Sequence, residues 1–167
     1  MDESPAQAEW RRWLDDHAPR FLLFARQKSR SEADAQDLVQ EAVCEAIRHT
    51  GERELPPVSL VYATIHRRAI DLARSENRRA IREQAVNLAG SEVWFDTIVE
   101  ERERASVVQN AMSRLPENYR EVVTLKVWGD LTFAQIAEAL DIPANTAASR
   151  YRYGLEELRK LTRGVLP

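Results

Sequence analysis

The chain has 167 residues, of which 44% are hydrophobic and 31% are charged, and its formal net charge is -3. This length suits one ordinary domain or two small helical ones. The negative charge argues against a chain that binds nucleic acid over its whole surface, because phosphate binding depends on positive potential, so any DNA-binding surface must find its basic residues locally.

Apolar residues recur three and four positions apart through most of the chain, and only 5 glycines interrupt them. This periodicity predicts an all-α protein, since period-two alternation bounded by turns is absent. We expect helices over residues 6–27, 33–49, 58–83, 97–114, 117–128, 132–140 and 145–162.

The second and third predicted helices differ in charge. In ADAQDLVQEAVCEAIRH the apolar residues form one stripe, with Asp37, Glu41 and Glu45 opposite. The loop HTGERELPPVS follows, and the third helix then carries an excess of arginine over acid. That local excess favours a phosphate partner over an ion-paired helix face. Its arginines are Arg67, Arg68, Arg74, Arg78, Arg79 and Arg82.

Residues 85–96 have weak periodicity and predict a linker. We therefore expect two small helical domains, over 1–84 and 97–167. No internal repeat appears. The helical spacing of most tryptophans favours core packing, whereas Trp94, in the linker, is a candidate docking residue.

The last two predicted helices have the pattern of a helix-turn-helix. Thr132 with Gln135 three residues later is a capping box, and Asp141-Ile142-Pro143 ends the first helix after two turns. A short helix, a tight turn and a polar second helix fit a DNA major groove, where Arg pairs with guanine and Asn with adenine. The alternative is a surface helix that Arg150 and Arg152 keep soluble; the capping box and turn favour DNA binding.

Three stretches resemble a known family. LPENYREVVTLKVWGDLTFAQIAEALDIPANTAASRYRYGLEELRKL resembles region four of bacterial RNA polymerase sigma factors, especially the extracytoplasmic-function group. DAQDLVQEAVCEAIRH and YATIHRRAIDLARSENRR resemble region two of that group. Both regions occur in the family's order with a suitable linker, so the resemblance covers about residues 20–163.

The resemblance implies a dissociable subunit that directs core RNA polymerase to promoter DNA and has no catalytic activity. Region two would dock on the clamp helices of the largest polymerase subunit and help to melt the minus-ten element. Region four would bind the minus-thirty-five element. An anti-sigma factor is a further candidate partner, although nothing in the sequence identifies one.

The family's functional positions fall on three sets of residues in this chain. The polymerase-binding set is Asp34, Asp37, Leu38, Gln40 and Glu41. The minus-ten set is Tyr62, His66, Arg67, Arg68, Arg74, Asn77, Arg78 and Arg79. The upstream-element set is Asn145, Thr146, Ser149, Arg150 and Tyr153, with Arg152 on phosphate.

Some positions depart from the family pattern. Asp141 stands where a turn glycine is common, and Asp tolerates the left-handed conformation better than most residues. Ala148 and Tyr153 occupy frequently basic positions, and Leu60 occupies a position that is often Trp. We expect these differences to alter promoter choice more than family membership.

Other classes of function find little support. The single Cys44 cannot form an internal disulfide, and His17, His49 and His66 lack partners at metal-ligand spacing, so we expect no metal or cofactor. No phosphate loop or nucleophile motif indicates an enzyme. The polar start and the lack of an apolar run near 20 residues predict a cytoplasmic protein without membrane insertion.

Two alternatives remain at this point. A dimeric helix-turn-helix regulator that binds a palindromic operator explains residues 117–162 equally well, but it gives DAQDLVQEAV and the basic helix no purpose. A purely helical adaptor requires the basic pattern to be accidental.

Overall fold

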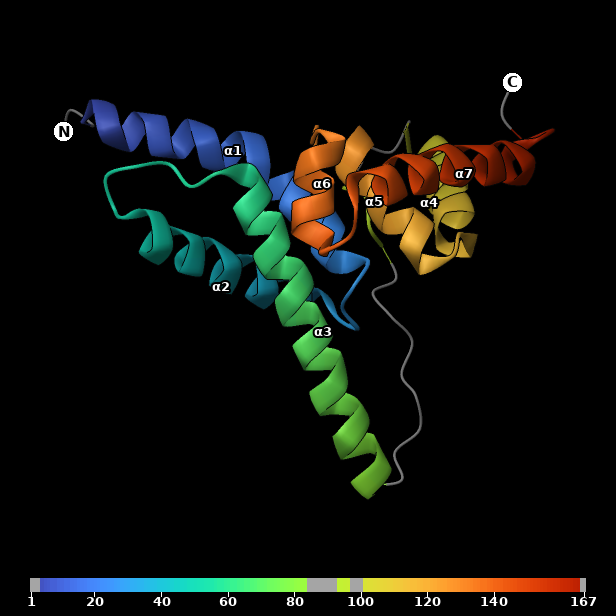
Figure 1. Ribbon diagram of the computed structural model, residues 1–167, viewed down its shortest axis with the longest axis horizontal. Coiled ribbons are helices and arrows are strands. Elements are labelled where there is room, and N and C mark those ends of the chain that lie inside the picture. The colour runs from blue at the N-terminus through green and yellow to red at the C-terminus, as the bar shows by residue number, and fades with distance from the viewer. Residues whose placement is uncertain (1–3, 84–92, 97–100, 166–167) are drawn as a thin grey trace. The chain divides into compact units, whose positions relative to one another are not determined.

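A computed structural model describes residues 4–83, 93–96 and 101–165, and these residues form seven helices and no strand (Figure 1). The prediction of an all-α protein is confirmed. The helices are α1 (Pro5–Arg26), α2 (Glu32–Thr50), α3 (Val58–Glu83), α4 (Arg102–Arg114), α5 (Glu117–Val127), α6 (Phe133–Leu140) and α7 (Ala144–Thr162).

The predicted helix ends agree with these bounds to within one residue, except at the start of α4. There the prediction began at residue 97, whereas α4 begins at Arg102. Residues 97–100 lie outside the described residues. Among the described residues, no helix combines the length and the apolar character needed to cross a membrane.

Contacts divide the chain into an N-terminal unit, Met1–Glu92, and a C-terminal unit, Val93–Pro167. The division falls within the predicted linker 85–96, of which residues 85–92 are outside the described part. The domain boundaries at 84 and 97 stay predictions.

In the N-terminal unit, α1, α2 and α3 pack against one another around an aromatic core. The Tyr62 ring of α3 makes edge-on contacts with Phe21 and Phe24 of α1, at centroid distances of 5.0 and 5.6 Å. Helix α2 contributes mainly small residues, and Ala35, Ala42 and Ala46 are buried on it. Small side chains let the helix axes approach closely, so α2 is held near α3 along much of its length.

An ion pair between the buried Arg26 and the largely exposed Glu32 connects α1 to the start of α2. The Arg26 guanidinium, 6% exposed, donates from Nε and Nη2 to the two carboxylate oxygens of Glu32, at 2.8 Å each. The Ser31 hydroxyl caps α2 by accepting from the Asp34 amide. These contacts set where the acidic face of α2 begins.

The C-terminal half of α3 extends past α1 and α2 (Figure 1). Its residues from Ile70 onward are mostly exposed, and Ile81 is 73% exposed. Arg74, Arg78 and Arg79 on this half are therefore exposed.

The C-terminal unit is built on α7, which contacts α4, α5 and α6. Met112, Leu125 and Ile136 are fully buried in its core. At Gly154 of α7 the approach to α5 is so close that a Cβ atom would lie 2.7 Å from Val123 Cγ2. A larger residue at this position would force Val123 or the two helices to shift.

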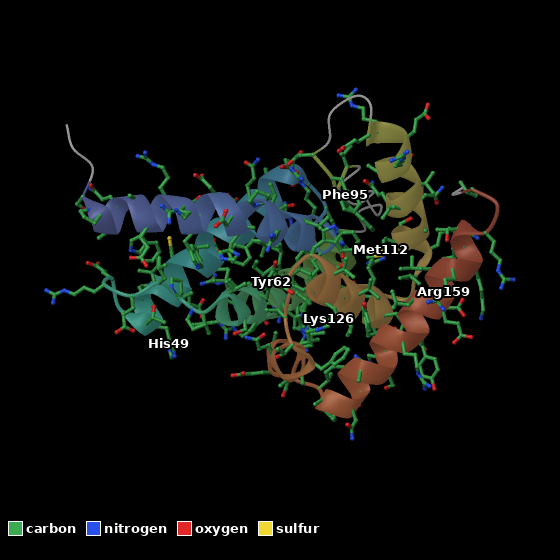
Figure 2. All side chains as sticks on the ribbon, turned by 90° about the horizontal axis from the view of Figure 1, so that it is seen from above. His49, Tyr62, Phe95, Met112, Lys126 and Arg159 are labelled. Carbon is green, nitrogen blue, oxygen red and sulfur yellow. The ribbon has the colours of Figure 1, made fainter. Side chains whose placement is uncertain are left out.

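Trp94 and Phe95 pack against the C-terminal unit, whereas Val93 and Asp96 beside them are exposed. Trp94 is 8% exposed, its amide donates to Gln109 Oε1 at 3.0 Å, and the Arg120 guanidinium lies 5.6 Å from its ring centre. Phe95, labelled in Figure 2, packs against Trp128, with 5.6 Å between the two ring centres. The expectation that Trp94 is a docking residue is wrong, because its side chain is already used within its own unit.

Candidate functional site

The turn between α6 and α7 has the predicted geometry. The Thr132 hydroxyl accepts from the Gln135 amide at 3.2 Å, and Gln135 Oε1 accepts from the Thr132 amide at 2.9 Å, so the capping box is confirmed. Asp141 ends α6 in the left-handed conformation, with φ 54° and ψ 52°. The chain thus turns after eight residues of α6 and enters α7 at Ala144.

The polar face of α7 is exposed to solvent, as the sequence predicted. Its opposite face is anchored by Ala147 and Gly154, both buried, so the 3.6-residue period turns the intervening positions outward. Asn145 and Tyr153 are exposed, and Thr146, Ser149 and Arg150 are half-buried at its edge. All the predicted upstream-element residues thus lie on one accessible face.

Contacts within α7 restrict two of these side chains. Ser149 Oγ donates to the carbonyl oxygens of Asn145 and Thr146, so its proton is used within the helix and its oxygen is left to accept. Arg152 Nη2 donates to Tyr153 Oη at 3.0 Å, and its guanidinium lies 4.7 Å from the Tyr153 ring centre. Arg152 and Tyr153 therefore form a single cationic and aromatic group.

Tyr62 does not belong to the predicted minus-ten surface. Its side chain is 1% exposed inside the N-terminal unit (Figure 2), and burial raises the pKa of its hydroxyl. A side chain enclosed by Phe21 and Phe24 cannot stack on a base, so its assignment as a DNA contact is wrong. The sequence held a signal for this, because Val61, Ile65 and Ala69 share its side of the helix.

The other members of the minus-ten set divide into two groups along α3. Arg74, Asn77, Arg78 and Arg79 are exposed on the extended half. Arg67 and Arg68 lie beside α2 and form ion pairs with its carboxylates. His66 is half-buried next to them.

The ion pairs of Arg68 use all three guanidinium nitrogens. Nε and Nη2 lie 2.9 and 2.7 Å from Glu45 Oε2, and Nη1 lies 2.6 Å from Glu41 Oε2. Arg67 Nη2 donates to the other oxygen of Glu45. One carboxylate of α2 thus holds two arginines of α3.

These contacts change the acidity of Glu45. Burial acts to raise the pKa of this carboxyl, but the hydrogen bond from Arg68 and the charges of both arginines outweigh burial and lower it. Glu45 is therefore ionised at neutral pH. Sequence reasoning placed Glu45 on the polar side of α2 but in no functional set, because its partners are 22 and 23 residues away.

Four of the five predicted polymerase-binding residues, all except Gln40, line a groove between α2 and α3. Asp37, Gln40 and Glu41 are exposed, and Asp34 is half-buried. The groove, about 380 Å³ in volume, is lined by Asp34, Asp37, Leu38, Glu41, Arg68, Asp71, Leu72 and Ser75. Four carboxylates against one guanidinium make it acidic.

Leu38 differs from its neighbours in the predicted polymerase-binding set. It is only 5% exposed, so little of its side chain is accessible to a partner. Its remaining accessible surface lies in the groove. Asp71 of α3 also lines the groove, because α3 packs on α2.

Comparison with known families and proteins agrees with this division. Residues 13–79 match the model of sigma-70 region 2, and residues 106–158 match the model of sigma-70 region 4. The first range covers most of α1 to α3, and the second contains the helix-turn-helix. Together the two ranges include well over half of the chain.

Similar curated proteins are extracytoplasmic-function (ECF) RNA polymerase sigma factors. SigK of Mycobacterium ulcerans is 31% identical over 107 residues, which are 62% of this chain and 57% of that protein. SigK of Mycobacterium tuberculosis H37Rv is 27% identical over 160 residues, which are 92% and 85% of the two chains. SigW of Bacillus subtilis is 38% identical over 63 residues, which are 38% and 34%.

A solved structure has the same fold at low identity. It is the sigma factor RpoE in complex with the anti-sigma factor NepR from Bartonella quintana, and it matches with a TM-score of 0.72 and 16% identity over 95% of this chain and 99% of that one. With matches to both sigma-70 regions in one chain, the protein belongs to the sigma-70 family, in its extracytoplasmic-function group.

Proposed function

We propose that this protein is a sigma factor that directs core RNA polymerase to specific promoters. One observation carries the proposal: a region 2 match with an acidic groove and a region 4 match with a helix-turn-helix occur in the same chain. A dimeric regulator of a palindromic operator leaves the groove and the basic α3 without a purpose. The protein would act in the cytoplasm, at the nucleoid, and have no catalytic activity of its own.

The acidic groove is the proposed polymerase-binding site. Asp34, Asp37 and Glu41 give it a negative potential that attracts a basic partner surface and sets its orientation. Gln40 adds an exposed amide beside them. Leu38 would contribute apolar contact from within the groove and not from its rim.

The extended half of α3 is the proposed contact with the minus-ten element. Arg74, Arg78 and Arg79 provide positive charge for the phosphates, and Asn77 provides a donor and an acceptor for an unpaired base. Arg74, Asn77, Arg78 and Arg79 are exposed among the described residues, so a strand of DNA can reach them.

The polar face of α7 is the proposed contact with the upstream element. Asn145 and Arg150 have side chains that pair with base edges, whereas Arg152, held against Tyr153, suits a phosphate and sugar contact. Thr146 and Ser149 lie between them and can accept hydrogen bonds.

An anti-sigma factor is the proposed inhibitory partner. The structural neighbour RpoE is described in complex with the anti-sigma factor NepR. The acidic groove and the exposed arginines of α3 offer such an inhibitor two sites to block.

Reconstituted transcription tests the function. Purified protein is mixed with core polymerase and fragmented genomic DNA of the source organism, and the transcripts are sequenced. We expect start sites that share paired upstream and minus-ten elements and that vanish without the protein. Binding to a palindrome in the absence of polymerase, with no new start sites, would support the dimeric regulator instead.

Charge reversal tests the polymerase site. Asp37→Lys with Glu41→Lys should abolish co-purification with core polymerase, while Glu52→Lys with Glu54→Lys, an equal charge change on the exposed loop before α3, should not. Equal binding by both double variants would contradict the groove assignment.

Alanine substitution tests the minus-ten contact. Arg78→Ala with Arg79→Ala should reduce promoter opening, measured by permanganate reactivity of the melted strand. Arg12→Ala with Arg53→Ala removes the same charge from exposed positions outside α3 and should leave opening unchanged. Normal opening by the α3 variant would mean that these arginines are only surface charge.

A further inference from the structure

Two arginines of the minus-ten set, Arg67 and Arg68, are already paired with acidic side chains. Arg67 and Arg68 were predicted to bind phosphate, yet both hold carboxylates of α2 in the free protein. An arginine cannot make its full set of charge-assisted hydrogen bonds to a carboxylate and to a phosphate at once, because both acceptors need the same guanidinium edges. The carboxylates and the DNA therefore compete for the same two side chains.

The competition is strongest at Arg68. All three of its nitrogens are directed to Glu41 and Glu45, and its side chain is only 32% exposed. Arg67 is 57% exposed and shares Glu45. We call Glu41 and Glu45 the α2 carboxylate pair.

We propose that the α2 carboxylate pair withholds Arg67 and Arg68 from nucleic acid until a basic partner engages α2. This inference rests on the proposed function, in which α3 binds DNA and the groove binds polymerase. Glu41 is the link, because it lines the groove and also holds Nη1 of Arg68.

The coupling follows from shared contacts. A cationic surface that binds Glu41 weakens its hold on Nη1 of Arg68, so this edge of the guanidinium becomes available to a phosphate oxygen. By thermodynamic reciprocity, DNA that draws Arg68 away leaves Glu41 free for the cationic surface. The free protein then binds DNA weakly, and the same face of α3 gains positive charge once polymerase is bound.

Glu45 is a positioning residue in this scheme, since it acts through the two arginines and touches no nucleic acid itself. Its carboxyl is partly enclosed, with 35% of the side chain exposed, and the two guanidinium groups fix both of its oxygens. Removing the negative charge of Glu45 should strengthen nucleic-acid binding more than removing that of Glu41, because Glu45 pairs with both arginines.

Binding of full-length protein to fluorescein-labelled dT20 tests the proposal, with anisotropy measured over a range of salt concentrations. Each arginine that gains a phosphate should steepen the slope of log K against log salt by about 0.7, which near 0.05 M salt corresponds to about eightfold tighter binding. We expect Glu45→Gln to gain about one such contact and Glu41→Gln less. The double variant should gain up to about two.

The matched control is Glu32→Gln. Glu32 also lies on α2 and also forms an ion pair, but its partner is Arg26 of α1. The control should change the affinity by less than about twofold. Equal gains from Glu32→Gln and Glu45→Gln would overturn the proposal, because they would reflect net charge alone.

Further variants separate failure of this proposal from failure of the proposed function. In a background of Arg67→Ala with Arg68→Ala, Glu45→Gln should no longer raise the affinity; a gain that persists overturns the proposal. Arg74→Ala with Arg78→Ala should lower the affinity for dT20. If the Arg74→Ala, Arg78→Ala variant binds dT20 more weakly while Glu45→Gln changes neither affinity nor salt slope, only the proposed role of the α2 carboxylate pair is refuted. If that double variant binds dT20 normally, α3 is not the nucleic-acid surface, and both this proposal and the proposed minus-ten contact fail.

Discussion

Replacing Gly154 by alanine should destabilise the C-terminal unit, although alanine is the better helix former. An added Cβ would lie 2.7 Å from Val123 Cγ2 and 3.4 Å from Tyr119 Cβ. Carbon atoms prefer separations of about 3.5 to 4.0 Å, so α5 and α7 must move apart by about 1 Å or Val123 must rotate. Val123 is 1% exposed and β-branched, which leaves it little freedom.

The net effect is the difference between two terms. Overpacking a tight core costs about 1 to 3 kcal/mol, whereas exchanging glycine for alanine inside a helix gains about 1 kcal/mol. We therefore expect a loss of about 1 kcal/mol in the free energy of opening α7. That loss raises the opening constant about fivefold.

Hydrogen exchange of the full-length protein, followed by mass spectrometry, measures this directly. Peptides from α5 and α7 should exchange about fivefold faster in the Gly154→Ala variant, while peptides from α1 to α3 serve as the internal reference. Adding Val123→Ala, which removes the colliding methyl, should make the pair of substitutions less damaging than the sum of the two single effects. Slower exchange of α7 in Gly154→Ala would refute the close approach at this position.

Three further expectations follow from the described contacts. Tyr62→Ala should lower the free energy of unfolding of the N-terminal unit by about 3 to 5 kcal/mol in urea, as for other buried aromatic residues, whereas Tyr62→Phe should leave promoter opening intact; a specific opening defect in the latter would return Tyr62 to the DNA surface. Arg150→Ala should cost about 1 to 3 kcal/mol of binding to the upstream element if it contacts a base, and the loss should then disappear on a scrambled element; an equal loss on both would identify a phosphate contact. Burial and then the charge of Arg20 lower the pKa of His17 below 6.5, so the folded state binds fewer protons than the unfolded one. Stability of the N-terminal unit should fall as the pH drops below about 6.5, and His17→Phe, which keeps the aromatic contacts with Trp13 and Phe21, should reduce that dependence.

Local sequence patterns determined most of the secondary structure. The capping box at Thr132 and Gln135 and the turn at Asp141 depend on residues at most a few positions apart, so the sequence alone was sufficient to place them. The outward face of α7 followed in the same way, because the 3.6-residue period separates Asn145 and Tyr153 from the buried Ala147 and Gly154.

Motif positions carried over from the family were less reliable than periodicity. Tyr62 and Leu38 were assigned to surfaces on their motif positions, but each lies on the apolar side of its helix and is buried. Trp94 lies in a stretch without periodicity, so nothing local indicated that it packs beside Gln109 and Arg120. Its burial depends on contacts 15 and more residues away.

The sequence by itself determined the helices, the helix-turn-helix and the location of the basic and acidic segments, because these depend on neighbours along the chain. The packing of α3 against α2 decided which charged side chains are paired with each other and which can bind a partner. It brought Arg68 onto Glu41 and Glu45, which are 27 and 23 residues away, and it placed Asp71 in the acidic groove. An ion pair between separate helices needs a defined register of one helix on the other, and that register is fixed by the buried side chains of the whole unit.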